Sequence, residues 1–218
     1  MKRLYILSLL IVLAACTTRP AQLRTGDLIF VGIPENYRIA GSMAEAISVS
    51  TNQDSLNIIH TAIADVRGDS VWIIDATIKH GVDRHPLDTF LNDFTLKDGS
   101  LPVFEVMRLK DSRRAASFVE NAKKYLGLPY DTRFLPDNGA LYCSELVRES
   151  YLGGDGKPLF DEFPMNFRDR EGNMPLYWEQ LFAILGMDVP QDVPGTNPQE
   201  MSSSPLLRPV NLSRDFWK

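Results

Sequence analysis

The sequence is poor in cysteine, in histidine and in basic runs, and each shortage narrows the functions that the chain can have. Its 218 residues include two cysteines and three histidines. Three scattered histidines form no ligand spacing such as HExxH, so we expect neither a metal nor another cofactor. The formal net charge is −5 and no run of Lys or Arg occurs, which argues against a nucleic-acid partner.

Long apolar runs are also missing, and the run at the N-terminus is too short to span a bilayer. Lys2 and Arg3 precede YILSLLIVLAA, the layout of a secretory signal, and this run ends in LAAC, which resembles a bacterial lipobox. An ordinary signal peptide is the alternative. We expect a signal peptide at 1–15, a lipidated tether at 16–22 beginning with Cys16, and an exported protein. Its lipid would anchor it to the periplasmic face of the bacterial envelope, at the outer membrane.

Lipidation of Cys16 would leave Cys143 as the one thiol of the mature domain, so no internal disulfide could form. Cys143 stands in GALYCSELV, where a helix is expected to begin and to place Cys143, Leu146, Val147 and Ser150 on one face. A small buried core residue is one interpretation. The other is a nucleophile, because a helix N-terminus favours a thiolate and its free N–H groups can stabilise an oxyanion.

Residues 23–218 are expected to form a single α+β domain, since strands and helices are mixed without strict alternation. Strand patterns cover 26–33, 57–66, 71–78, 81–85 and 101–109, and helix patterns cover 35–52, 86–93, 111–127 and the segment from 143. Asp111 or Ser112 is expected to cap the helix at 111–127, which Gly127 ends. After about residue 185, abundant Pro, Ser and Asn predict a loosely structured C-terminal wrap.

The hairpin at 57–78 can supply a general base. A two-residue turn at Gly68-Asp69 places Thr77 opposite His60. Asp75 is then a diagonal neighbour on the face of His60, about 7–8 Å away before the side chains reach toward each other. A carboxylate there would fix the tautomer of the imidazole. A three-residue turn would move Asp75 to the opposite face.

Strand alternation places His60 on the face of Ile58, Ala62, Ala64 and Val66. The two alanines leave room for another element, such as a helix that carries a thiol, to approach closely. Taken alone, however, His60 is typical of a packed core histidine.

Other interpretations of the carboxylate and of the remaining histidines stay open. Asp75 taken alone is equally typical of an edge-strand carboxylate that faces water. His80 and His85 lie in a polar, turn-like segment and are expected to be solvated. Thr77 and His80 remain alternatives to Asp75 as the group that orients His60.

The motifs HTAIADV, VWIIDAT, YLGLPYDTRF and YCSELV, in this order, resemble the YiiX/YaeF-like permuted papain-fold amidases, which are relatives of the NlpC-type cell-wall peptidases. LRTGDLIF and PGTNP extend the resemblance over most of residues 23–198. The histidine and the aspartate precede the cysteine, which is the permuted order. The resemblance implies a helix that carries a cysteine nucleophile and packs against a small antiparallel sheet or open barrel.

Carried over by position, the resemblance implies that Cys143 is the nucleophile, His60 the base and Asp75 the orienting group. Family members often carry glutamate at the third position, so aspartate is a shorter substitute. The resemblance also implies a substrate-binding or oxyanion region at Tyr130, Asp131 and Tyr142. For the first two, a purely structural corner is the alternative.

We therefore expect a monomeric envelope lipoprotein that hydrolyses an amide bond in a cell-wall peptide or a small N-acylated amino-acid compound. One alternative is an acyltransferase, because the permuted topology also resembles that of lecithin retinol acyltransferase relatives. Another is a non-catalytic binding lipoprotein on the same fold. Product analysis with an added amine acceptor separates the first two, and the reactivity of the Cys143 thiol tests the third.

Overall fold

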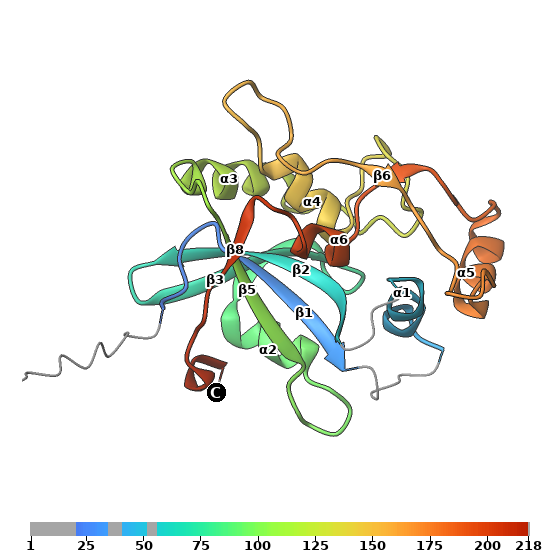
Figure 1. Ribbon diagram of the computed structural model, residues 1–218, viewed down its shortest axis with the longest axis horizontal. Helices are drawn as coiled ribbons and strands as arrows, with labels where there is room; N and C mark the ends of the chain where they lie inside the picture. Colours follow the sequence, from blue (N-terminus) through green and yellow to red (C-terminus); the bar gives the residue numbers. More distant parts are fainter. Residues whose placement is uncertain (1–20, 35–40, 52–55, 218) are drawn as a thin grey trace, which may run out of the picture.

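The computed structural model describes residues 21–34, 41–51 and 56–217, and an open antiparallel sheet of six strands organises them (Figure 1). The strand order is β4-β3-β2-β1-β5-β8. The strands are β1 (Leu28–Pro34), β2 (Leu56–Arg67), β3 (Ser70–Thr77), β4 (Gly81–Pro86), β5 (Val103–Leu109) and β8 (Leu207–Pro209). A second sheet pairs β6 (Phe163–Pro164) with β7 (Pro194–Gly195). The expected α+β class is confirmed, and the sheet does not close into a barrel.

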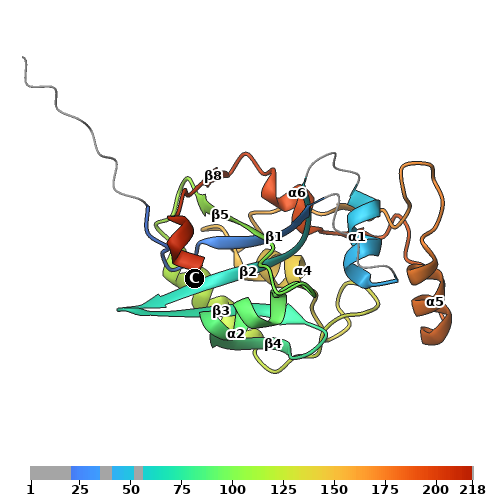
Figure 2. The same cartoon turned by 90° about the horizontal axis from the view of Figure 1, so that it is seen from below.

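Helices cover both faces of the large sheet (Figures 1 and 2). On one face lie α3 and α4, on the other lies α2, and α1 and α5 stand together at one end of the sheet. The helices are α1 (Met43–Thr51), α2 (Leu87–Phe94), α3 (Ala115–Ala122), α4 (Cys143–Ser150), α5 (Leu176–Leu185) and α6 (Pro198–Ser202), with short 3₁₀ turns η1 (Lys123–Tyr125) and η2 (Arg214–Trp217). No helix of the described residues is both long and apolar enough to cross a membrane.

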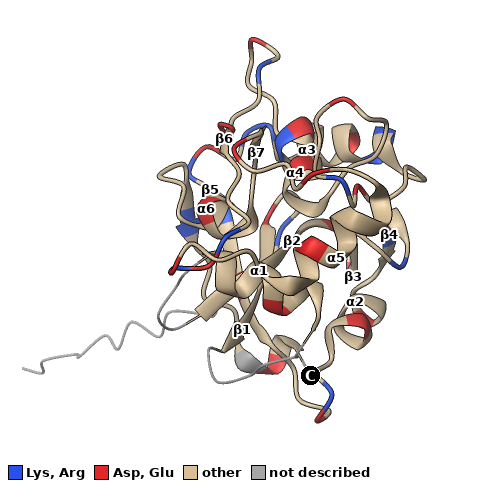
Figure 3. Ribbon diagram, turned by 90° about the vertical axis from the view of Figure 1, so that its right-hand side faces the viewer, with Lys and Arg blue, Asp and Glu red and all other residues tan. Residues whose placement is uncertain are grey.

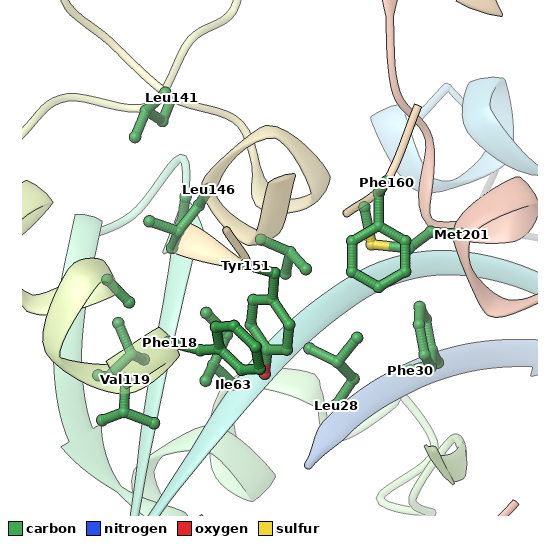
Figure 4. Close-up of a cluster of buried hydrophobic side chains, with 14 of the residues drawn as sticks. Leu28, Phe30, Ile63, Phe118, Val119, Leu141, Leu146, Tyr151, Phe160 and Met201 are labelled. Atoms are coloured by element: carbon green, nitrogen blue, oxygen red, sulfur yellow. The ribbon is translucent and has the colours of Figure 1, made fainter. Parts of the chain in front are cut away.

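The core between the sheet and α3/α4 holds the N-terminus of α4 in place (Figure 4). Leu146 and Val147 of α4 are fully buried in this cluster, which also contains Leu28 of β1. Each such side chain contributes about 2 kcal/mol by leaving water. Just after α4, the ring of Tyr151 stacks on Phe118 of α3 with 4.5 Å between centroids. Because this anchor is rigid, the first residue of α4 has a defined position over the sheet.

The opposite face of the sheet corrects one expectation. Ala62 and Ala64 do lie on it, but Phe90 of α2 packs there, so α2 and not the thiol-bearing helix uses the space beside the alanines. Ile58 lies in the other core cluster, because a β-bulge where β1 pairs with β2 changes the alternation. His60 stays on the α2 side, with its ring centroid 4.7 Å from that of Phe94.

The C-terminal segment is more ordered than its composition predicts. Residues beyond 185 form β7, α6 and β8, and β8 pairs with β5 as an edge strand of the large sheet. These short elements interrupt the loosely structured wrap that the composition predicts. Proline and serine weaken a strand pattern locally, but the exposed edge of β5 offers hydrogen bonds that the isolated segment lacks.

One expected helix start also differs from the structure. The helix α3 begins at Ala115 with Arg114 as its N-cap, and Asp111 instead binds the side chain of Arg113. The helix expected at 35–52 is described from Met43 onward, and its first part, 35–40, lies outside the described residues. The expected signal peptide and the lipidation site at Cys16 also lie outside them.

Candidate active site

The register of the β2–β3 hairpin brings Asp75 to His60. Pairing runs from Arg67 opposite Ser70 to Ile63 opposite Ile74, as the two-residue turn predicts. Asp75 is 1% exposed, and its Oδ2 lies 2.8 Å from Nε2 of His60. The predicted geometry of this pair is confirmed. Since the carboxylate takes the far ring nitrogen, it selects the Nε2–H tautomer of a neutral His60.

Cys143 completes a chain of three side chains. It is the first residue of α4, it is buried, and its side chain forms a hydrogen bond with His60. Because Asp75 occupies Nε2, the ring nitrogen left for the sulfur is Nδ1. The fold thus brings together the three residues that the sequence predicts as catalytic, from β2, β3 and α4. Their catalytic roles stay predictions.

The electrostatics of this chain favour a separated pair of charges. Burial alone lowers the pKa of His60, but the negative charge of Cys143 and hydrogen bonds to Asp75 and Cys143 outweigh it and raise that pKa to about 10. Burial acts to raise the pKa of the Asp75 carboxyl, yet hydrogen bonds from His60 and His85 bring it below its ordinary value. At neutral pH His60 is therefore a buried imidazolium that faces the carboxylate of Asp75.

His85 corrects the sequence-based expectation of a solvated loop histidine. It lies in β4, is 6% exposed, and its Nε2 is 2.9 Å from Oδ1 of Asp75. The strand is turned back by Gly81, whose φ is +68° and where a Cβ would collide with the carbonyl oxygen of Leu128. One signal was present in the sequence: a three-residue turn at 78–80 makes His85 a diagonal neighbour of Asp75, as His60 is on the other side.

The other candidates for orienting His60 lie elsewhere. His80 is exposed in the turn before β4, as expected, and its Nε2 is 3.0 Å from Oδ2 of Asp93. Thr77 accepts a hydrogen bond from the backbone N–H of His80 through its hydroxyl. Both side chains are therefore engaged outside the chain of Cys143, His60 and Asp75.

A narrow cleft with about 50 Å³ of free space opens beside Cys143. None of the described residues that line it is Lys, Arg, Asp or Glu, and the charged positions lie mostly on the outer loops and helices (Figure 3). The lining residues are Ile47, Ser50, Thr51, Ile59, Tyr130, Phe134, Tyr142, Cys143, Ser144, Met165, Asn166, Phe167, Trp178, Thr196, Asn197 and Pro198. Sequence reasoning included PGTNP (194–198) in the family resemblance but did not place it at the site, and it missed the wall formed by 165–178.

The three residues assigned to the substrate or oxyanion region differ in their surroundings. Tyr130 and Tyr142 both line the cleft, and the hydroxyl of Tyr142 accepts a hydrogen bond from the backbone N–H of Thr196 at 2.9 Å. Asp131 is buried, and its two oxygens accept the backbone N–H groups of Arg133 and Leu135. Asp131 thus holds the corner that carries the cleft wall, while a direct role toward substrate stays a prediction.

Glu145 is a second unusual carboxyl, two residues after Cys143 in the first turn of α4. Its Oε2 accepts a hydrogen bond from the backbone N–H of Tyr142 at 3.4 Å. Burial raises the pKa of this carboxyl to about 8, against the effect of that hydrogen bond and with the help of the nearby charges of Asp131 and Glu149. Near neutral pH it is therefore largely protonated and places no full negative charge beside the thiol.

Replacing Glu145 by glutamine is expected to flatten the pH dependence of stability. The folded-state pKa of about 8 lies above the ordinary value of 4.5, so the stabilisation is complete below pH 4.5 and is lost as the pH rises through about 8. As the pH rises from 4.5 to 8, urea unfolding should show that the free energy of unfolding of the wild type falls by up to a few kcal/mol relative to that of E145Q. E179Q, which removes an exposed carboxylate from the first turn of α5, is the control. An identical slope in wild type and E145Q would contradict the expectation.

Comparisons with known proteins identify the family. Residues 22–211 match the family described as "Permuted papain-like amidase enzyme, YaeF/YiiX, C92 family". The chain is 26% identical over 211 residues to the uncharacterized protein YiiX of Escherichia coli K12. This alignment covers 95% of this chain and 94% of that protein. A crystal structure described as metalloprotein YiiX from Escherichia coli O157:H7 is similar with a TM-score of 0.66 and 25% identity, over 87% of this chain and 97% of that one. The chain therefore belongs to the YaeF/YiiX (C92) family of permuted papain-like amidases.

Proposed function

We propose that this protein is an envelope lipoprotein that hydrolyses the amide bond of small N-acylated compounds through an acyl-enzyme on Cys143. The observation that carries the proposal is the chain from Cys143 through His60 to Asp75, at a helix N-terminus and beside a cleft whose described lining has no Lys, Arg, Asp or Glu. Such a chain is the arrangement that activates a thiol for nucleophilic attack. The lipobox-like LAAC supports anchoring through Cys16.

The reaction needs no group beyond these side chains and water. The thiolate of Cys143 attacks the carbonyl carbon and forms a C–S bond, and the carbonyl oxygen takes the negative charge. The Nδ1–H of His60 then protonates the amide nitrogen as the C–N bond breaks and the amine leaves. Neutral His60 next takes a proton from water, whose oxygen attacks the thioester. The C–S bond breaks, the acid is released, and the ion pair is restored.

Two groups are placed to stabilise the oxyanion. The backbone N–H groups in the first turn of α4 point out of the helix end at Cys143. Tyr130 lines the same cleft, and burial, followed by the charge of Cys143, raises the pKa of its phenol well above the ordinary value. Its O–H is therefore kept as a donor, and its present partner is the weakly accepting sulfur of Met43 at 3.9 Å.

The lining of the cleft favours an uncharged acyl group. A charged acyl group would lose its hydration among aromatic side chains such as Phe134, Phe167 and Trp178, and the described lining of the cleft has no Lys, Arg, Asp or Glu to pair with it. Within the two substrate classes that the family suggests, this favours a small N-acylated amino-acid compound over an ionised cell-wall peptide on the acyl side.

A metal is not part of the proposal, although the structure of the relative YiiX is described as a metalloprotein. In the part of the chain that the structure describes, no three His, Cys, Asp or Glu side chains are grouped to hold a metal ion. Two side chains that could otherwise donate a nitrogen, His60 and His85, each use Nε2 on Asp75 instead. These residues do not fit a metal site.

A panel of fluorogenic coumarin amides tests the proposal. Octanoyl and phenylacetyl amides should release coumarin and transiently add the mass of the acyl group to the protein. Succinyl and lysyl amides should react at least about tenfold more slowly. A tenfold lower rate corresponds to an activation barrier about 1.4 kcal/mol higher, the cost of burying a poorly solvated charge. Intact-mass spectrometry and fluorescence measure the two outcomes. Adding glycinamide shows whether the acyl group passes to water or to an amine. Binding without any adduct would instead indicate a non-catalytic module.

A further inference from the structure

We infer that His85 is a positioning residue of this site, which holds the carboxylate of Asp75 so that its other oxygen meets His60. The inference rests on the proposed function and extends it by one residue. The site then comes from four elements: β2, β3 and α4 carry His60, Asp75 and Cys143, and β4 adds His85. His85 does not touch the sulfur, so it acts through Asp75.

The three side chains come from three adjacent strands. Asp75 lies on β3, the middle strand, between β2 with His60 and β4 with His85. His85 pairs with Ile73, so it is a diagonal neighbour of Asp75 just as His60 is. The two imidazoles therefore approach one carboxylate from opposite sides, at 2.8 Å from Oδ2 and 2.9 Å from Oδ1.

This arrangement determines where protons sit. An ionised carboxylate only accepts hydrogen bonds, so both imidazoles must present an Nε2–H to Asp75. With one oxygen held by His85, the carboxylate cannot rotate without breaking a buried bond, and the oxygen bound to His60 keeps its direction. His60 therefore keeps its proton on Nε2 and turns Nδ1 toward Cys143.

Burial makes the second imidazole necessary. Asp75 is 1% exposed, so water does not reach an oxygen that His85 leaves unbound. A buried carboxylate oxygen without a donor favours protonation of the group, and a protonated Asp75 no longer stabilises an imidazolium at His60. Removing His85 should thus weaken the ion pair although Cys143 and His60 are untouched.

The remaining contacts of His85 indicate support, not proton transfer. Its Nδ1 is buried and has no hydrogen-bond partner among the described residues, so no proton path leads on from the ring. The ring packs beside Phe90, with 6.4 Å between centroids. Asp83 and Asp93 are the other acidic groups that favour its charged form, and His80 lies 6.1 Å away, ring to ring.

Alkylation of the full-length protein by iodoacetamide between pH 5 and 9 tests this role. Peptide mass spectrometry follows the adduct at Cys143 separately from Cys16, so the rate reports the reactivity of Cys143 without a substrate. His85→Leu should lower the rate at pH 6 by about tenfold, the effect of a shift of one pKa unit. His85→Gln, whose amide can reach the position of Nε2, should stay within about threefold of the wild type. His80→Leu is the matched control and should react like the wild type.

The outcomes separate this inference from the proposed function. A slow wild type that follows an ordinary thiol curve would overturn the proposed function and the inference together. A fast wild type with a slow His60→Ala, but with His85→Leu as fast as the wild type, would overturn the inference alone. If the leucine variant does not fold, His85→Asn serves in its place, because its shorter amide cannot reach Oδ1. Equal rates for the Gln and Asn variants would then contradict the role.

Discussion

Replacing Cys143 by alanine is expected to abolish the hydrolysis of the best amide in the panel, with kcat falling by at least about 10⁴-fold. The variant lacks the atom that forms the thioester, and water at this site has no comparable nucleophilicity. The acyl adduct should vanish from the intact-mass spectrum as well. Folding should be little affected, because the sulfur is a small group at the edge of the core around α4.

Ser150→Ala is the matched control for this variant. Ser150 is buried on the same face of α4, where its hydroxyl donates to the carbonyl of Leu146 at 2.6 Å. It lies two turns from Cys143, so the variant should keep nearly the full kcat while suffering a comparable local loss of packing. Activity that persists in Cys143→Ala but falls in Ser150→Ala would show that the hydrolysis does not use the thiol.

His60→Ala is expected to remove the cation that stabilises the thiolate. In the wild type the pKa of His60 is raised to about 10, so the imidazolium persists from pH 6 to 9 and should make Cys143 alkylate faster at pH 6 than a free thiol does. In the variant the rate should instead rise through this range, as for a free thiol with a pKa of about 8.5, and at pH 6 it should be at least about tenfold lower. The kcat for amide hydrolysis should fall by about 10³-fold or more, since the general acid is lost too.

His80→Ala is the control for His60→Ala. It removes an imidazole from the turn before β4, where His80 binds Asp93 and not Asp75. Its alkylation profile should match that of the wild type. If His60→Ala alkylated as fast as the wild type at pH 6, the thiolate would owe its stability to the helix N-terminus alone, and the proposed pair would be wrong.

Local patterns in the sequence predicted much of the candidate site. The Gly68-Asp69 turn sets the register of β2 and β3, and the structure confirms that Asp75 shares the face of His60. Hydrophobic spacing placed Cys143 at the start of a helix whose inner face is buried. These features depend on residues near one another in the chain, where turn geometry and helix periodicity act directly.

The tertiary structure alone decided the surroundings of those residues. Ile58 changed sides because a bulge against β1 breaks the alternation, and α2 took the alanine face that the sequence left open to any helix. The wall of the cleft comes from segments about 20 to 55 residues beyond Cys143, which meet it only when β6 pairs with β7 and α6 reaches β2.

What the sequence by itself determined is therefore the identity and order of the reacting groups: a thiol at a helix start, preceded by a histidine and an aspartate in one hairpin. What only the tertiary structure decided is how they are held. In the sequence His85 resembles a loop residue, and only the pairing of β4 with β3 brings it to Asp75. The described lining of the cleft, which contains no Lys, Arg, Asp or Glu, comes from segments that are far apart in the chain. The reason is physical: turns and periodicity are short-range, whereas burial and hydrogen bonding to a shared carboxylate depend on which distant segments pack together.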